Sequence, residues 1–348
     1  MRFLVLLLCL STCNAFVDYF RIGTIFSDEN MTFRKMIVDL TSTHSFVLDY
    51  DKFSSHGKNN AFNLNNSTTK LNTTQEFRYQ YSEEYNPGAS EVSGFIFQDE
   101  LYALGSVVNV SFGVAQRITG NDDPSVFDTL PNAGRIGFSR APGAAIRDAM
   151  FAREDRLQRI LCLYVAVLLL DEGTFPVITM GGPAYRPSLL RTIAPSPPNP
   201  GGLWTFNVNR IDVGKFHITE VPEATLSTTL DAISLPTGLF DKVIMATDGH
   251  FDESVGGFVA ACSQDIPINV GVNNATIPIR YDAYTKNLGE NRCLLKLRKT
   301  EESIALGAPF FFSNGVCLDY DANEVHFFDA TARDEDDLNA LSANKRIW

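Results

Sequence analysis

Apolar residues along the chain gather in short runs, and Gly, Pro and Asn lie between the runs. Residues 19–26, 77–81, 93–97 and 107–112 are examples. Such runs, repeated at regular spacing, are typical of β-strands joined by turns. The pattern therefore predicts a mostly β protein.

Five further segments complete this outline. Residues 142–159 and 239–246 predict helices, because no Gly or Pro interrupts either segment after position 143. Residues 160–170 form an apolar run that is too short to span a bilayer and predicts a buried strand. The proline-rich residues 187–200 predict a surface loop, and residues 324–328 predict the last strand.

The chain of 348 residues is long enough for two lobes, each with a core of its own. We predict an N-terminal lobe over residues 16–182, a C-terminal lobe over residues 183–332 and an acidic tail over residues 333–348. Residues 1–15 have the parts of a secretory signal peptide: a basic residue, a short apolar core and the small residue Ala15 at the cut. The sequence thus predicts a secreted protein, in an extracellular space or an acidic lumen.

Sequons for N-glycosylation agree with secretion, and their clustering near residues 60–75 predicts an exposed loop. The candidate acceptors are Asn30, Asn65, Asn66, Asn72, Asn109 and Asn274.

Four cysteines remain once the signal peptide is removed: Cys162, Cys262, Cys293 and Cys317. An even number in an oxidising compartment predicts two structural disulfides, and three pairings are open. None of the four has the close spacing of a zinc or redox site.

The net charge of −12 argues against nucleic acid and anionic membranes as partners. The five histidines show no metal-ligand spacing, and no phosphate-loop or serine-hydrolase motif is present. We therefore expect a protein without a metal or a cofactor.

Two aspartates follow apolar runs and precede short polar loops. Asp39 is followed three residues later by Ser42, and Asp231 repeats the arrangement with Ser234. Two such loops, about one lobe length apart, suggest a duplicated unit whose two carboxylates face each other.

These two loops, with further segments in the same order along the chain, resemble those of the pepsin family of two-lobed aspartic proteases. The likeness covers nearly the whole mature chain. The matching segments are the first strands, the first aspartate loop, the flap hairpin, the two hydrophobic-hydrophobic-Gly segments under the loops and the final strands: residues 18–23, 36–47, 77–94, 134–138, 304–311 and 317–327.

This resemblance implies a bilobal fold of two β-barrel-like lobes around a central cleft. In the family, a water held between one ionised and one protonated carboxylate hydrolyses a peptide. The resemblance makes Asp39 and Asp231 that pair, gives Ser42 and Ser234 the role of hydrogen-bonding them, and makes Tyr81 the flap tyrosine over the substrate.

The family also suggests a disulfide between Cys262 and Cys293. Cys162 and Cys317 would then form the second bridge, between two strands of the sheet that joins the lobes.

Both aspartate loops depart from the family's Asp-Thr-Gly pattern. Leu40 and Ala232 stand where the family has a threonine that bonds across to the other lobe, so we expect that network to be absent. Thr41 and Ile233 stand where the family has a glycine, whose missing Cβ lets its N–H approach the carboxylate. Displacing a catalytic group by about 1 Å can cost on the order of a hundredfold in rate, so these changes predict weak or lost proteolysis.

Three functions follow from the sequence. The first is a secreted, monomeric pepsin-like protein with weak or lost proteolytic activity and a cleft between its lobes that binds a peptide or protein ligand. The second is an active aspartic endopeptidase with atypical loops, because both aspartates and both serines remain. The third is a non-catalytic secreted glycoprotein in which only the surface matters.

Overall fold

The computed structural model describes residues 21–26, 33–53, 61–67, 69–82, 89–103, 106–119, 134–153, 158–167 and 174–330. The predicted signal peptide and acidic tail lie outside these residues. The described chain is predominantly β, as the sequence pattern predicted.

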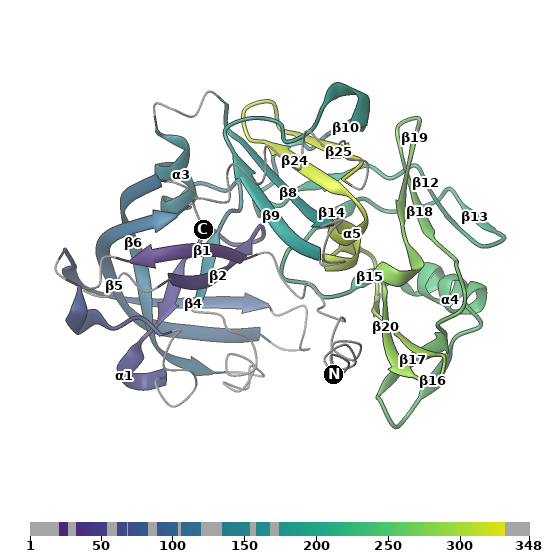
Figure 1. The fold of residues 1–348 in the computed structure, drawn as a ribbon, viewed down its shortest axis with the longest axis horizontal. Coiled ribbons are helices and arrows are strands. Elements are labelled where there is room, and N and C mark those ends of the chain that lie inside the picture. The colour runs from purple at the N-terminus through teal and green to yellow at the C-terminus, as the bar shows by residue number, and fades with distance from the viewer. Residues whose placement is uncertain are drawn as a thin grey trace, which may run out of the picture.

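The N-terminal half forms one seven-stranded sheet, drawn at the left of Figure 1. Its strands are β1 (Arg21–Phe26), β2 (Phe33–Asp39), β3 (Phe46–Leu48), β4 (Leu71–Ser82), β5 (Ala89–Ala103), β6 (Ser106–Thr119) and β7 (Gly134–Gly137). The order is β1-β2-β7-β3-β6-β5-β4, and β1 also pairs with β5. The sheet therefore curls back on itself, which agrees with a barrel-like unit.

The C-terminal half forms three smaller sheets, at the right of Figure 1. The first has the order β11-β14-β23-β15-β22: β11 (Thr205–Phe206), β14 (Ala224–Leu226), β15 (Ile233–Pro236), β22 (Leu297–Thr300) and β23 (Ile304–Leu306). The second has the order β13-β12-β18-β19: β12 (Arg210–Val213), β13 (Phe216–Ile218), β18 (Ile268–Val272) and β19 (Ala275–Ile279). The third has the order β16-β17-β21-β20: β16 (His250–Asp252), β17 (Gly257–Ala261), β20 (Thr285–Gly289) and β21 (Arg292–Leu295).

A five-stranded sheet, in the order β10-β25-β24-β8-β9, joins segments from distant parts of the chain. Its strands are β8 (Ile160–Val167), β9 (Thr174–Met180), β10 (Leu190–Pro195), β24 (Gly315–Asp319) and β25 (Glu324–Phe328). Central β24 is buried from its first residue to its fourth, as expected for a strand covered on both faces. The prediction of a last strand at residues 324–328 is confirmed.

Short helices complete the fold: α1 (Tyr50–Phe53), α3 (Ala145–Phe151), α4 (Thr237–Ala246), α5 (Ala308–Ser313), and the 3-10 turns η2 (Leu64–Asn66), η3 (Pro187–Leu189) and η4 (Tyr281–Ala283). The helix predicted at residues 239–246 is confirmed by α4. The helix predicted over residues 142–159 is shorter, because α3 ends at Phe151 and residues 154–157 lie outside the described part. No helix in the described part of the chain is long and apolar enough to cross a membrane.

The proline-rich residues 187–200 are not simply a loop. Their middle forms β10, which pairs with β25 at the edge of the five-stranded sheet. An edge strand needs N–H donors on one side only, so the proline at its end, Pro195, is compatible with the pairing. The sequence prediction gave too much weight to the prolines.

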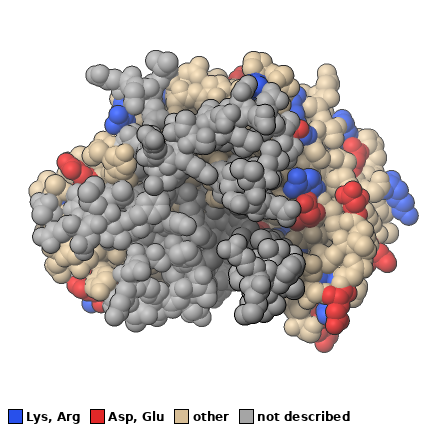
Figure 2. All heavy atoms as spheres, viewed as in Figure 1, with Lys and Arg blue, Asp and Glu red and all other residues tan. Residues whose placement is uncertain are grey.

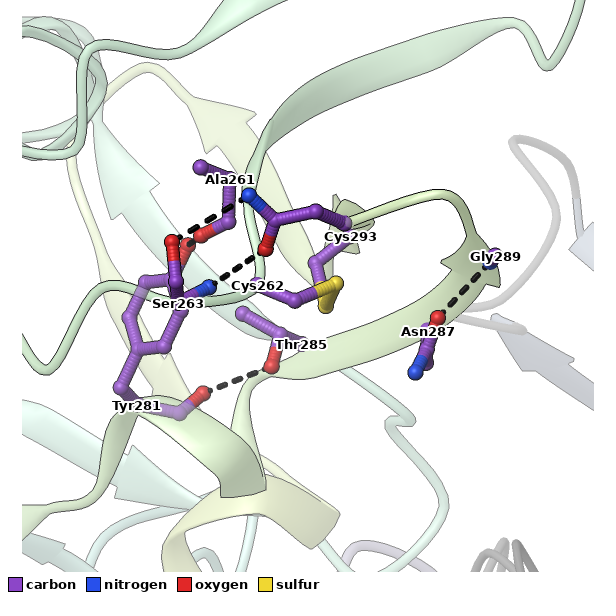
Figure 3. The surroundings of a disulfide bond; sticks show 9 residues. Ala261, Cys262, Ser263, Tyr281, Thr285, Asn287, Gly289 and Cys293 are labelled. Carbon is purple, nitrogen blue, oxygen red and sulfur yellow. Dashed lines mark hydrogen bonds between the residues drawn. A yellow bond between two sulfur atoms is a disulfide. The ribbon is translucent and has the colours of Figure 1, made fainter.

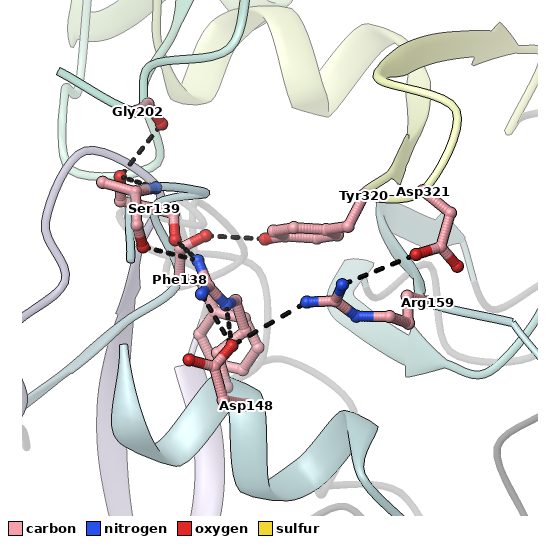
Figure 4. A network of polar contacts seen from close by, with 9 residues as sticks. Phe138, Ser139, Asp148, Arg159, Gly202, Tyr320 and Asp321 are labelled. Atoms are coloured by element: carbon pink, nitrogen blue, oxygen red, sulfur yellow. Dashed lines mark hydrogen bonds and ion pairs between the residues drawn. The ribbon is translucent and has the colours of Figure 1, made fainter. Parts of the chain in front are cut away.

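A polar network ties α3 and the end of β7 to the C-terminal half (Figure 4). The hydroxyl of Tyr320, which is buried, donates to the carbonyl of Phe138 at 2.6 Å, and the hydroxyl of Ser139 donates to the carbonyl of Gly202 at 2.9 Å. Burial raises the pKa of Tyr320, so its hydroxyl remains a donor. Arg147 donates to the carbonyl of Ser139 and lies over the Tyr320 ring, so the two halves are joined by buried polar contacts as well as by the apolar core.

Candidate active-site loops

Asp39 stands at the end of β2, where the chain leaves the sheet for a short loop. Strand β7 runs parallel to β2 and places Gly137 beside Asp39. A Cβ on Gly137 would lie 2.4 to 2.7 Å from the backbone of residues 42–44, so only glycine lets β7 pass beneath the loop. The loop and the hydrophobic-hydrophobic-Gly segment therefore pack as one unit, and Asp39 is 2% exposed within it.

The Asp39 carboxylate is held on both oxygens. Thr41 donates to Oδ1 from its backbone N–H at 2.8 Å and from its hydroxyl at 2.7 Å. On the other side, Nη1 of Arg135 lies 3.4 Å from Oδ2, and both side chains are almost fully buried. Arg135 comes from β7, inside a segment that sequence reasoning singled out only for its glycine. Its contact with Asp39 could not be anticipated, because it depends on the parallel pairing of β7 with β2.

The same arrangement recurs in the C-terminal half. Strand β14 runs parallel to β23 and places Leu226 beside Leu306, as β2 and β7 place Val38 beside Ile136. The glycine after Leu306, Gly307, lies against the second loop, where a Cβ would come within 2.1 Å of the Leu230 carbonyl oxygen. The residue that follows Leu226 thus occupies the place of Asp39, and that residue is Ser227.

The next strand gives an independent check of this register. Strand β3 pairs with β7 so that Phe46 lies opposite Arg135, and β15 pairs with β23 so that Ser234 lies opposite Ala305. Phe46 comes seven residues after Asp39, and Ser234 comes seven residues after Ser227. Two separate pairings therefore give the same correspondence.

Asp231 is consequently not the counterpart of Asp39, contrary to the expectation from the sequence. It lies four residues beyond Ser227, at the place that Thr43 takes in the first loop. Nζ of Lys296 is 2.7 Å from its Oδ1, and the Asp231 side chain is 28% exposed. Sequence reasoning chose Asp231 because it is an aspartate. Leu226, Ser227 and Thr228 form the pattern of an apolar residue, a polar residue and a threonine. Matching this pattern to the segment that ends in Gly307 would have placed the counterpart of Asp39 four residues before Asp231.

The two predicted serine partners also have other places. The hydroxyl of Ser42 accepts the backbone N–H of His44 at 3.0 Å, while Thr41 and Arg135 contact the Asp39 carboxylate. Ser234 is a buried residue of β15, paired with β22 and β23. Among the described residues, neither serine therefore makes the predicted hydrogen bond to an aspartate carboxylate.

One hydroxyl does cross between the two loops. Oγ1 of Thr228, which is buried, donates to the carbonyl of Val38 at 2.6 Å and accepts the N–H of Leu40 at 3.2 Å. We expected no such link, because Leu40 and Ala232 lack hydroxyls. The expectation followed from the misplaced register: Thr228, directly after Ser227, is the residue that corresponds to Leu40.

The hairpin of β4 and β5 approaches the first loop through aromatic contacts. The rings of His44 and Tyr79 stack with centroids 3.7 Å apart and planes 8° from parallel. Partial desolvation against the hairpin lowers the pKa of His44, which remains exposed on its other side, and burial raises the pKa of Tyr79. Tyr81, the predicted flap tyrosine, pairs with Ser90 near the end of the hairpin ladder, and its side chain lies outside the described part.

Both disulfides are those that the sequence analysis favoured. Cys262 bonds to Cys293, and Cys162 bonds to Cys317. Cys162 and Cys317 are opposite each other on β8 and β24, so this bridge does join two strands of the five-stranded sheet.

The candidate glycosylation sites fall on varied surfaces. Asn65, Asn109 and Asn274 are exposed, Asn66 is half-buried, the side chain of Asn72 is outside the described part, and Asn30 lies outside it altogether. Asn274 occupies the turn between β18 and β19.

Among the described residues, no three His, Cys, Asp or Glu side chains gather as a metal site would need. On the face shown in Figure 2, acidic and basic side chains lie side by side over the described surface.

A parallel strand pair beneath a short polar loop, present once with Asp39 and again with Ser227 in a mostly β chain, indicates the class of two-lobed aspartic-protease folds. The family model of eukaryotic aspartyl proteases matches residues 29–330, and the chain therefore belongs to that family. No curated protein sequence matches the chain.

Proposed function

We propose that this protein is a secreted member of the aspartyl protease family that does not hydrolyse peptides through a carboxylate pair. It keeps the fold for binding a peptide or protein between its two loops. The observation that carries the proposal is Ser227, which stands at the symmetric counterpart of Asp39.

The family reaction needs a base and an acid on opposite sides of one water. Two neighbouring carboxylates supply both, because like charges so close cannot both ionise and the pair keeps one proton. A serine hydroxyl does not share a proton with a carboxylate in this way. Arg135 strengthens the argument, because its cation lies where it neutralises the remaining carboxylate of Asp39.

Two observations support the binding and secretion parts of the proposal. The hairpin of β4 and β5 contacts the first loop through His44 and Tyr79, so a cover for an extended ligand is retained. Two disulfides and the exposed sequons at Asn65, Asn109 and Asn274 suit an oxidising, extracellular compartment.

Cleavage of a quenched-fluorescent peptide library between pH 3 and 6 tests the catalytic part. We expect the same background rate for the natural chain and for Asp39→Asn. Cleavage that Asp39→Asn abolishes and a statine-type inhibitor blocks would overturn the proposal and favour the active endopeptidase.

A gain of function makes the test two-sided. We expect inhibitor-sensitive cleavage to appear when both loops regain the family pattern, through Leu40→Thr, Thr41→Gly, Ser227→Asp and Thr229→Gly together with Arg135→Leu. The matched control contains the same changes with Ser227 left in place. Equal activity of the two variants would contradict the role given to position 227.

Thermal unfolding with and without the statine-type inhibitor tests the binding part. Binding to the folded state raises the melting temperature, so we expect an increase for the natural chain. No increase would contradict a peptide-binding cleft and favour a glycoprotein that acts through its surface alone.

A further inference from the structure

A pocket of about 750 Å³ opens in the C-terminal half, and Cys262 and Cys293 are among the residues that line it. Figure 3 shows the surroundings of the disulfide between these two cysteines. It is lined by the turn after β17, by η4 and by the first part of β20. Neither aspartate loop contributes to it. The pocket is therefore a feature separate from the loops that carry Asp39 and Ser227.

The charged side chains that line the pocket are one arginine–aspartate pair and one further carboxylate. Arg280 makes two contacts with Asp282, from Nε to Oδ1 at 3.1 Å and from Nη2 to Oδ2 at 3.3 Å, and this pair is neutral as a unit. The remaining charged lining residue is Asp265, which is exposed at the rim. The pocket thus carries a net negative charge, which favours a cationic group.

The pocket also holds a buried acceptor without a donor. Oε1 of Gln264 is buried and has no hydrogen-bond partner. Such atoms are rare in folded proteins, because a buried polar group that is left unpaired costs free energy. Because water cannot reach this oxygen, a ligand N–H can pair with it only after the Gln264 side chain, which lines the pocket, turns toward the pocket.

The remaining walls suit an aliphatic stem. Pro267, Pro278 and the disulfide present apolar surface. Lysine and arginine side chains lay their methylene groups along such surfaces while the charged head meets polar groups.

An open strand edge borders the same pocket. Within the described sheet, β20 is an edge strand that pairs with β21 alone. The N–H of Lys296 donates to the carbonyl of Tyr284, so the alternation of an antiparallel ladder turns the backbone groups of Thr285 and Asn287 away from β21. Both of these residues line the pocket, but Thr285 is only 6% exposed, so the accessible part of the edge begins after it and includes Asn287.

We propose that this pocket binds a lysine or arginine side chain of an extended peptide that pairs along the open edge of β20. In this mode of recognition, main-chain hydrogen bonds to an edge strand give affinity, and a pocket beside the edge selects the side chain. Asp265 and Gln264 meet the cationic head, and the prolines and the disulfide pack on its stem.

The test is titration of the full-length protein with a fluorescent acetylated pentapeptide that has arginine at its centre. Its partner probe contains citrulline, which has nearly the same shape without the charge. We expect the arginine peptide to bind at least about fivefold more tightly than the citrulline peptide, and an excess of the statine-type inhibitor to leave binding unchanged.

Two variants locate the site. Asp265→Asn should weaken binding about three- to fivefold, and Gln264→Met should weaken it without lowering the melting temperature, because the unpaired oxygen is removed. Glu220→Gln, the same loss of charge at an exposed residue that does not line the pocket, is the control. Equal binding of the two peptides, displacement by the inhibitor, no detectable binding or no effect of Asp265→Asn would each overturn the proposal.

Discussion

Each of the two loops related by internal symmetry keeps one of two groups, a carboxylate or a hydroxyl, and lacks the other. The first has the carboxylate of Asp39 but Leu40 in place of a hydroxyl, and the second has the hydroxyl of Thr228 but Ser227 in place of a carboxylate. The contact that docks the loops is thus separable from the group that would perform chemistry. One hydroxyl satisfies both a carbonyl and an N–H of the opposite loop.

The aspartates of the two loops, Asp39 and Asp231, differ in how deeply their carboxylates are buried. Asp39 is 3% exposed in its side chain and pairs with the buried Arg135, whereas Asp231 is 28% exposed and pairs with Lys296. Water can solvate the second carboxylate if its partner is lost, but it cannot reach the first. Position within the loop therefore decides how strongly each carboxylate depends on its cation.

The largest loss of stability is expected from substitutions of the two glycines beneath the loops. Gly137→Ala and Gly307→Ala each place a Cβ against backbone atoms that have no room to move, and each should lower the free energy of unfolding by about 4 kcal/mol. Urea denaturation measures this. Gly238→Ala is the control, because nothing lies within 4 Å of the added Cβ. A small effect at only one of the two loop glycines would break the correspondence between the loops.

The second-largest difference in stability between the two loops is expected from removing the cation of each ion pair. Arg135→Met leaves the buried Asp39 without a counter-charge and should cost about 3 kcal/mol, whereas Lys296→Met should cost about 1 kcal/mol because Asp231 is partly solvated. Adding Asp39→Asn to Arg135→Met should restore part of the loss. Equal costs for the two single variants would contradict the comparison.

The hydroxyl that crosses between the loops comes third. Thr228→Val keeps the shape of the side chain but leaves the carbonyl of Val38 and the N–H of Leu40 unpaired, at a cost of about 2 kcal/mol in unfolding free energy. Thr229→Val is the matched control, because that hydroxyl contacts Ser227 within its own loop. A control that costs as much as Thr228→Val would show that the link between the loops has no special weight.

The smallest effect concerns pH. Partial desolvation lowers the pKa of His44 in the folded state from its ordinary 6.5, so the unfolded chain takes up this proton first as the pH falls. The contribution of His44 to stability is therefore complete above pH 6.5 and declines as the pH drops through that value towards the lowered pKa. Melting temperatures from pH 8 to 5 should fall less for His44→Asn than for the natural chain. Parallel curves would show that the stacking on Tyr79 leaves the titration of His44 unchanged.

The sequence predicted the β architecture, the helix at α4, the place of Asp39 and both disulfides. These features depend on patterns that are local in the chain or on a family likeness with several ordered motifs. The counterpart of Asp39 was misplaced because residue type outweighed strand register, and register is set by pairings with residues some 80 positions away, such as Leu226 with Leu306. The contact of Arg135 with Asp39 was hidden for the same reason.

The bridge between Cys162 and Cys317 has a consequence for what a protease can do to this protein. The bond spans 155 residues and joins β8 to β24. A single cut in any exposed loop between the two cysteines would leave both fragments attached. Under oxidising conditions the nicked chain would migrate as one molecule, and its two parts would separate only after reduction.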